Sequence, residues 1–236
     1  MLFITGDCHG DFSKLSNTNW PESTYLTRDD YIIVTGDFGL IFHPTQSKDE
    51  IWWTKWISEK PWTLLFIDGN HDNHPKLNLL PREEKFGGEV GRIAENIFHL
   101  RRGEIYEICE KKILTFGGAR SIDKAYRTEG ISWWPEELPN YADMDHCIES
   151  MEKHNRSVDL IIAHTCPQAL ASIIAGRRGN TVFEDPTQKM LDHITSACSF
   201  DHFFCGHWHE DISYGQYHFM YNRIINVDVL ERAFNG

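Results

Sequence analysis

The chain has 236 residues, of which 41% are hydrophobic and 25% are charged, so it is long enough to bury a sizeable core. Its formal net charge of -12 disfavours non-specific binding to long nucleic acids or to anionic membranes. A small phosphorylated substrate stays open, because bound metal ions supply local positive charge whatever the global balance.

Neither export nor a membrane span is indicated. The N-terminal segment Met1–Thr5 reaches Gly6 and Asp7 too soon for a secretory signal, and no apolar stretch is long enough to cross a bilayer. Six scattered cysteines form no C-x-x-C pair, which predicts free thiols in a reducing compartment. We therefore expect a cytoplasmic protein. Without repeats or linkers, residues 1–236 are expected to form a single domain.

Short apolar runs that stop at Gly, Asp, Asn or His alternate with helical spacing, which predicts an α/β fold. In chain order, the first strands are predicted at Leu2–Thr5 and Tyr31–Thr35. A helix at Lys48–Glu59 and a third strand at Thr63–Ile67 follow them. A hairpin closed at Glu110-Lys111 follows, formed by Glu104–Cys109 and Lys112–Phe116. The remaining helices are predicted at Tyr141–Asn155 and Glu184–Ala197, and the remaining strands at Leu160–Ala163, His202–Cys205, Ile212–Tyr214, Tyr217–Met220 and Ile224–Val227.

Good ligands for divalent cations follow these strands, at the end of the sheet where α/β proteins place their sites. The strand-end residues are Asp7, His9, Asp37, Asn70, His71, His164, His207 and His209. Asp7 with His9, and His207 with His209, are i, i+2 pairs, whose side chains converge on an extended segment. Four of these ligands directly follow a glycine, which permits tight turns and close approach. One such strand end alone is most simply a turn, but five in one chain favour a metal site.

The five motifs, in this order, resemble those of the calcineurin-like metallophosphoesterases. They stand here as Gly6-Asp7-Cys8-His9-Gly10, Gly36-Asp37-Phe38, Gly69-Asn70-His71-Asp72, Ala163-His164 and Gly206-His207-Trp208-His209. The resemblance spans nearly the whole chain, from Asp7 to His209. The segments Phe116–Asp123 and Ile131–Glu137 also resemble uncharacterised bacterial and phage members.

The resemblance implies a metallophosphoesterase-type β-sandwich flanked by helices on both outer faces, with a site at one end. It implies that one cation is held by Asp7, His9 and His209, and that the other is held by Asn70, His164 and His207. Asp37 would bridge them. Two cations about 3.5–4 Å apart can share a hydroxide that attacks a phosphate ester in line. Mn, Fe, Zn and Ni suit this donor set about equally.

The resemblance also implies that His71 acts as a general acid or as a donor to the phosphate, since family members use the histidine of G-N-H in this way. The alternative is a histidine that merely orients a metal ligand. Serine/threonine protein phosphatases carry G-D-x-x-D-R-G at the second motif, where Leu40 replaces the second Asp here and the Arg is missing. A protein-phosphatase assignment is therefore weak. Asp72 is a candidate to orient His71, with a helix N-cap or turn role as the alternative.

Substrate contacts are expected from Asn70, from His71 and from an arginine, because guanidinium matches phosphate bidentately. The candidates are Arg120, Arg127, Arg177 and Arg178, of which Arg120 is best placed, just after Gly117-Gly118. Each of them alone can equally be a solvated loop charge. Three tryptophans have two alternative roles, stacking on a base of the substrate or packing in the core. They are Trp133, Trp134 and Trp208. Segments 121–140 and 176–183 have the composition of insertions that cover a site.

The sequence thus predicts a metal-dependent hydrolase of phosphate esters, acting on a small molecule, nucleotide or short oligonucleotide. Phosphodiesterase activity is favoured over phosphomonoesterase activity, since no protein-phosphatase hallmark is present. One alternative is a nuclease, which would use the same motifs. Another is a catalytically inert binding module, although relatives of that kind usually lose ligands and this chain has lost none.

Overall fold

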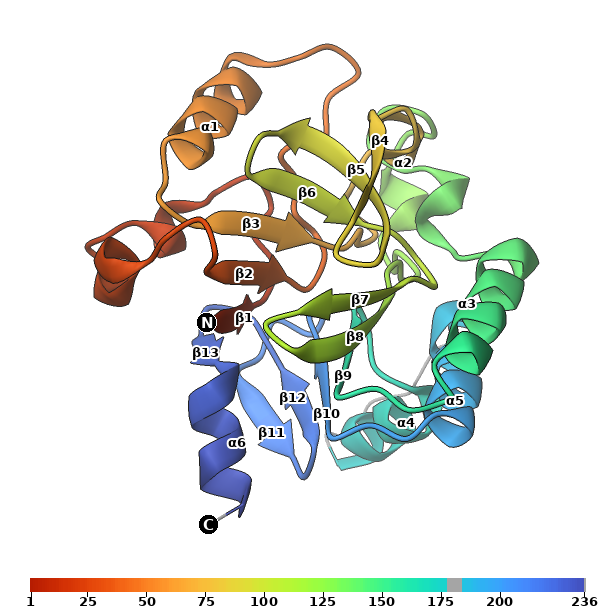
Figure 1. Cartoon of the computed structure of the whole chain (residues 1–236). Coiled ribbons are helices and arrows are strands. Elements are labelled where there is room, and N and C mark those ends of the chain that lie inside the picture. Colours follow the sequence, from red (N-terminus) through yellow and green to blue (C-terminus); the bar gives the residue numbers. More distant parts are fainter. Residues whose placement is uncertain (178–183, 236) are drawn as a thin grey trace.

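The computed structural model of the chain describes residues 1–177 and 184–235. Two mixed β-sheets pack face to face, and helices cover their outer faces (Figure 1). This arrangement confirms the α/β sandwich expected from the resemblance.

The first sheet has the strand order β13-β1-β2-β3-β6-β5-β4. Its centre is parallel and consists of β1 (Leu2–Thr5), β2 (Tyr31–Val34), β3 (Thr63–Phe66) and β6 (Ile97–Leu100). The antiparallel strands at its edges are β4 (Arg82–Lys85), β5 (Gly88–Ala94) and β13 (Ile224–Asn226). Because β1, β2 and β3 are parallel neighbours, the loops that follow them lie at one end of the sheet.

The second sheet has the order β11-β12-β10-β9-β8-β7. Its parallel centre consists of β8 (Lys111–Phe116), β9 (Leu160–Ala163), β10 (His202–Cys205) and β12 (Tyr217–Phe219). Antiparallel edges are formed by β7 (Ile105–Ile108) and β11 (Ile212–Tyr214). The loops after β9 and β10 therefore lie side by side as well.

Side chains alternate between the inter-sheet core and the two outer cores. On β1, Leu2 and Ile4 enter the layer between the sheets, while Phe3 packs in the outer core of the first sheet. On β9, Leu160 and Ile162 face the same central layer, and Ile161 faces the outer core of the second sheet. Continuous apolar runs are needed because these strands are buried on both faces.

The helices lie on opposite outer sides of the sandwich (Figure 1). α1 (Lys48–Ser58) packs on the first sheet through Trp53, Trp56 and Ile57. The second sheet is covered by α3 (Tyr141–Lys153), α4 (Gln168–Arg177) and α5 (Pro186–Ala197). Two further helices are α2 (His74–Asn78) and α6 (Val227–Asn235). Across the described ranges, no helix combines the length and apolarity needed to cross a membrane.

Several sequence-based boundaries need correction. The β7–β8 hairpin turns at Cys109 and Glu110, both with positive φ, one residue earlier than predicted. Strands β4–β6 and helices α2, α4 and α6 were not predicted. Gly176 and Arg177, the first residues of the predicted 176–183 insertion, are the last residues of α4. The rest of the predicted 176–183 insertion, with Arg178, lies outside the described residues. The 121–140 segment contains the 3-10 turns Lys124–Tyr126 and Pro135–Glu137.

Candidate active site

The predicted site residues gather at one end of the sandwich, on loops from both sheets. The loops after β1, β2 and β3 carry the first three motifs, and those after β9 and β10 carry the last two. Side chains separated by up to 200 residues in the chain are thereby brought within hydrogen-bond distance.

The loop backbone differs from the extended form that the i, i+2 spacing assumed. His9, His207 and His209 have φ values of 48°, 66° and 51°, and Asp37 has 44°, all in the left-handed region. The side chains converge because the loops turn, not because they alternate along a strand. Gly206 allows this close approach, since a β-carbon there would overlap the Asp7 carboxylate.

A first group of ligand atoms comes from Asp7, His9, Asp37 and His209, all within 4.8 Å of one another. The Nε2 atoms of His9 and His209 lie 3.0 Å apart, and His209 Nε2 lies 3.0 Å from Asp7 Oδ2. The two carboxylates are buried, whereas the two imidazoles are exposed. The group is therefore anchored in the protein and open to solvent on one side.

A second group lies beside the first and centres on Asn70. Its Oδ1 atom is 3.0 Å from His164 Nε2 and 2.9 Å from His207 Nδ1. The other ring nitrogen of His164, Nδ1, lies 2.9 Å from the carbonyl oxygen of Thr35. A carbonyl only accepts, so Nδ1 carries the proton. The Nε2 lone pair is then free to bind a cation.

Asp37 lies between the two groups. Its Oδ1 atom is 3.3 Å from His164 Nε2, and its Oδ2 atom is 3.8 Å from His9 Nε2. The same residue also holds the loops together. Its carbonyl accepts from the N–H groups of Cys8 (3.0 Å) and His9 (2.8 Å), and its Oδ1 accepts from the N–H of His71 (2.7 Å).

The pKa values of the site record an excess of buried negative charge. Burial alone would lower the pKa of His164, but Asp37 and Asp7 outweigh it and raise the value to about 10. Burial would likewise raise the pKa of Asp37, yet His164 holds it below its ordinary range. His207 has its pKa lowered to about 4, by burial and then by the neighbouring His164. A proton on His164 thus neutralises charge that a cation would neutralise equally well.

The donor set fits two divalent cations. Each group combines a hard oxygen with imidazole nitrogens, the mixture that borderline transition metals prefer. In addition, two imidazole nitrogens face each other in the first group and two converge on one amide oxygen in the second, and a cation between such lone pairs removes their repulsion. His164 also has, in the carbonyl group of Thr35, the kind of backbone partner that is typical of metal-binding imidazoles.

His71 stands at the open edge of the site. Its ring lies 5.4 Å from that of His9, edge to face. Nη2 of Arg127 is 3.2 Å from His71 Nε2. The guanidinium of Arg127 is itself held by Asp123, with Nε–Oδ1 and Nη2–Oδ2 distances of 2.7 and 2.6 Å. The 121–140 segment therefore brings a fixed positive charge to the G-N-H histidine.

Asp72 organises backbone rather than the His71 ring. The buried carboxylate accepts hydrogen bonds from the N–H groups of Phe38 (3.2 Å), Gly39 (2.8 Å) and Gly69 (2.8 Å). It thus joins the second and third motif loops, which corresponds to the turn role considered from the sequence.

Arg120 and the three tryptophans make contacts within the protein. The Arg120 guanidinium donates to the carbonyl of Glu184 at 2.7 Å, so it fastens its loop to the start of α5. Trp133 and Trp134 are buried, and Trp134 packs edge to face on Phe42. Trp208 is partly buried against Phe219. The packing alternative therefore describes these aromatic rings.

Sequence reasoning missed Ser121, which contacts the proposed ligand Asn70, and Glu137, which holds Ser121 in place. Asn70 Nδ2 donates to Ser121 Oγ at 3.1 Å, and Ser121 Oγ donates to Glu137 Oε2 at 2.6 Å. Ser121 N also donates to Glu137 Oε1, at 3.0 Å. All three side chains are buried. No sequence signal marks this pair, because Glu137 in a Pro-Glu-Glu loop is indistinguishable from a solvated charge.

Comparison with known proteins agrees with this geometry. No curated protein matches the sequence. The family described as calcineurin-like phosphoesterase (Metallophos) matches residues 2–211, a range that includes all five motifs. On this match, which covers most of the chain, the protein belongs to the calcineurin-like phosphoesterase family.

Proposed function

We propose that the protein is a two-metal phosphoesterase that hydrolyses small phosphate esters. The observation that carries the proposal is the convergence, at one end of the sandwich, of the seven oxygen and nitrogen donors expected for a member of this family. One cation would be held by Asp7, His9 and His209, and the other by Asn70, His164 and His207. Asp37 would contact both, because each of its oxygens faces one group.

When bound, the two cations supply Lewis acidity for the phosphoryl oxygens and lower the pKa of a nearby water. The identity of the metal stays open between Mn, Fe, Zn and Ni. The chain itself positions the phosphoryl group, since phosphoryl transfer depends mainly on orientation and charge neutralisation.

His71 is proposed to donate to the phosphate or to protonate the leaving oxygen. Burial, and then the neighbouring Arg127 and His9, lower its pKa, which Asp37 only partly offsets. The negative charge of an incoming phosphate would raise that pKa again and favour the protonated ring. We propose Arg127, rather than Arg120, as the arginine that contacts the phosphate, because its guanidinium already lies within hydrogen-bond distance of His71 Nε2.

The acidic net charge supports a small phosphorylated substrate over a long nucleic acid. Diesters are proposed ahead of monoesters, as the sequence suggested. The nuclease and the inert binding module remain the competing functions. Cleavage of long duplex DNA with a steep salt dependence would favour the nuclease, and metal binding without any turnover would favour the binding module.

Hydrolysis of mono- and bis-nitrophenyl phosphate, with each divalent metal added in turn to metal-free protein, tests the proposal. We expect metal-dependent turnover. Asp37→Asn should abolish it, and His71→Ala should lower kcat by about 10²–10⁴. An exposed histidine on α5 gives a matched control, since His193→Ala should leave kcat unchanged. Absence of turnover with every metal and ester would refute the proposed function.

A further inference from the structure

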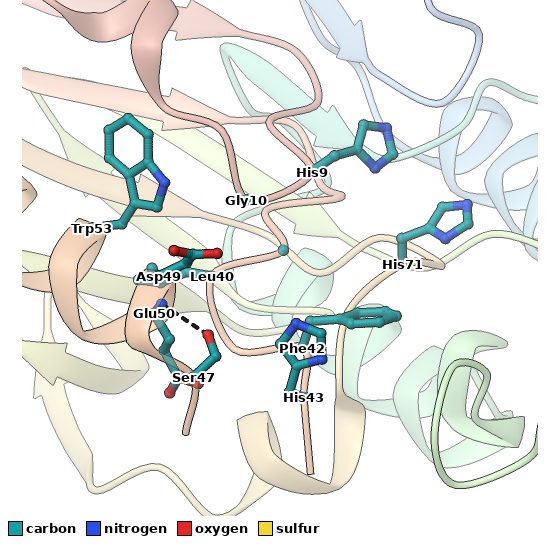
Figure 2. Close-up of a pocket in the computed structure, with 11 residues that line it drawn as sticks. His9, Gly10, Leu40, Phe42, His43, Ser47, Asp49, Glu50, Trp53 and His71 are labelled. Atoms are coloured by element: carbon teal, nitrogen blue, oxygen red, sulfur yellow. Dashed lines mark hydrogen bonds between the residues drawn. The ribbon is translucent and has the colours of Figure 1, made fainter. Parts of the chain in front are cut away.

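A cavity of about 260 Å³ opens beside the candidate active site. His9 and His71 form its wall on the side of the proposed metal centre, together with the loop glycines Gly10 and Gly39. Its opposite wall comes from the start of α1. Figure 2 shows the two histidine rings on one side of the view and Trp53 and Asp49 on the other.

An aromatic ring forms a rigid part of that opposite wall. Trp53 packs edge to face against Phe12 (5.4 Å between ring centroids), Trp52 (4.4 Å) and Trp56 (5.2 Å). These contacts hold the indole in place while leaving it partly exposed to the cavity. Phe42 adds a second ring, itself packed on Trp134.

Carboxyl groups without partners lie next to these rings. Asp49 is exposed, and no ion pair or side-chain hydrogen bond joins it to any residue in the described ranges. Glu50 lines the same cavity, is only 8% exposed, and its Oε2 atom has no hydrogen-bond partner among the described residues. Both lie in the first turn of α1, where acidic residues also complement the helix dipole.

The residues that line this cavity also show where positively charged side chains lie. Within the described part of the chain, no lysine or arginine lines the cavity. Arg127, the positive charge proposed for the phosphate, contacts His71 from the 121–140 segment and is not a lining residue. Asp49 and Glu50 thus lie on the side of the cavity opposite His71, the residue that Arg127 contacts.

This distribution of charge indicates which part of a substrate lies at the proposed metal site and which part lies in the cavity. A phosphoryl group is attracted to the proposed cations and Arg127, and is repelled by the side that carries Asp49. An aromatic face beside a carboxylate is the environment in which proteins recognise ammonium groups, through cation–π and ionic attraction together. The cavity is also smaller than the about 300–1,000 Å³ typical of drug-sized ligands, which favours a compact group.

We infer that this cavity binds the alcohol part of the substrate and selects an alcohol that carries an ammonium group. This inference rests on the proposed function, because it takes the phosphate to lie at the two-metal site. The substrate class is therefore a phosphate ester of a small amino alcohol, with the nitrogen between Trp53 and Asp49. Esters with a second phosphate or a carboxylate on the alcohol are disfavoured.

Two isosteric probes measure this preference directly. Choline and 3,3-dimethylbutanol have the same shape and differ in the positive charge, so we compare their phosphate monoesters and methyl phosphodiesters by phosphorus-31 NMR. We expect kcat/KM to be about 5- to 30-fold higher for the choline esters. Asp49→Asn should bring that ratio close to one, and Trp53→Leu should lower it independently. Glu59→Gln, an exposed acid at the other end of α1, is the control that should leave the ratio unchanged.

Calorimetric binding of the free alcohols separates this inference from the proposed function. Choline binding to the native protein that is lost in Asp49→Asn would support the cavity assignment even if no ester is turned over. Equal kcat/KM values for the two esters, or a preference that survives both Asp49→Asn and Trp53→Leu, would overturn it. Absence of any choline binding would overturn it too, whatever the esterase activity.

Discussion

Ser121→Ala tests how the 121–140 segment contributes to metal binding. Ser121 Oγ is the acceptor for Asn70 Nδ2 at 3.1 Å, and this bond leaves Asn70 Oδ1 facing His164 and His207. Removing the acceptor leaves a buried amide donor without a partner, at a cost of about 1–3 kcal/mol.

The cost falls mainly on the metal-bound state. Without a cation the Asn70 amide is free to rotate and satisfy its N–H groups elsewhere, whereas a bound cation requires Oδ1 in its present orientation. Since about 1.4 kcal/mol corresponds to a tenfold change in affinity, binding to the Asn70 group should weaken about 10- to 100-fold.

The assay is calorimetric titration of metal-free protein with Mn²⁺, in which the two proposed cations would give two binding steps. Ser121→Ala should weaken only one step, because the Asp7, His9 and His209 group does not contact Ser121. Ser132→Ala is the matched control, since its hydroxyl lies in the same segment but accepts from Thr128 N at 3.0 Å. Two unchanged affinities, or an equal loss in both, would refute this reasoning.

Three further changes have defined outcomes. Gly206→Ala pushes a methyl group into the Asp7 carboxylate and should cost about 1–3 kcal/mol in urea unfolding together with one bound metal; full metal content at native stability would contradict this. Burial lowers the pKa of His74 from 6.5 to about 3, so the folded state favours the neutral ring. The contribution of this neutral ring to the free energy of unfolding is complete above pH 6.5. It falls by about 1.4 kcal/mol for each pH unit between pH 6.5 and about pH 3. His74→Asn should therefore flatten the dependence of unfolding free energy on pH between 6 and 5, and an unchanged slope would count against the buried neutral ring. Arg127→Met should raise KM for a nitrophenyl phosphate ester about tenfold at unchanged thermal stability, and a native KM would remove Arg127 from the substrate site.

The central strands were predictable because burial on both faces demands continuous apolar runs. Leu2–Thr5, Leu160–Ala163 and His202–Cys205 are strands over their full predicted lengths. β4, by contrast, is made of charged residues, Arg82–Lys85, at the edge of the first sheet, where pairing rather than burial maintains the strand. The hairpin turn moved by one residue because Cys109 and Glu110 both adopt positive φ, which neither residue type signals.

The candidate ligands were predictable from their order, but the geometry that joins them was not. The notion of extended i, i+2 pairs was wrong for His207 and His209, whose left-handed backbone sends one ring to Asn70 and the other to Asp7. The contact between Arg127 and His71 depends on the path of the 121–140 segment, which no local pattern encodes. Asp72 and Arg120 were placed by sequence proximity, and their hydrogen bonds to neighbouring loops could not be predicted from the sequence.

The proposed ligands come from both halves of the sandwich. Asp7 and Asn70 follow strands of the first sheet, whereas His164 and His209 follow strands of the second. Each cation held as proposed would fasten one sheet to the other at the open end of their shared core. Metal loading would then raise the melting temperature and slow amide exchange in β1 and β9 together.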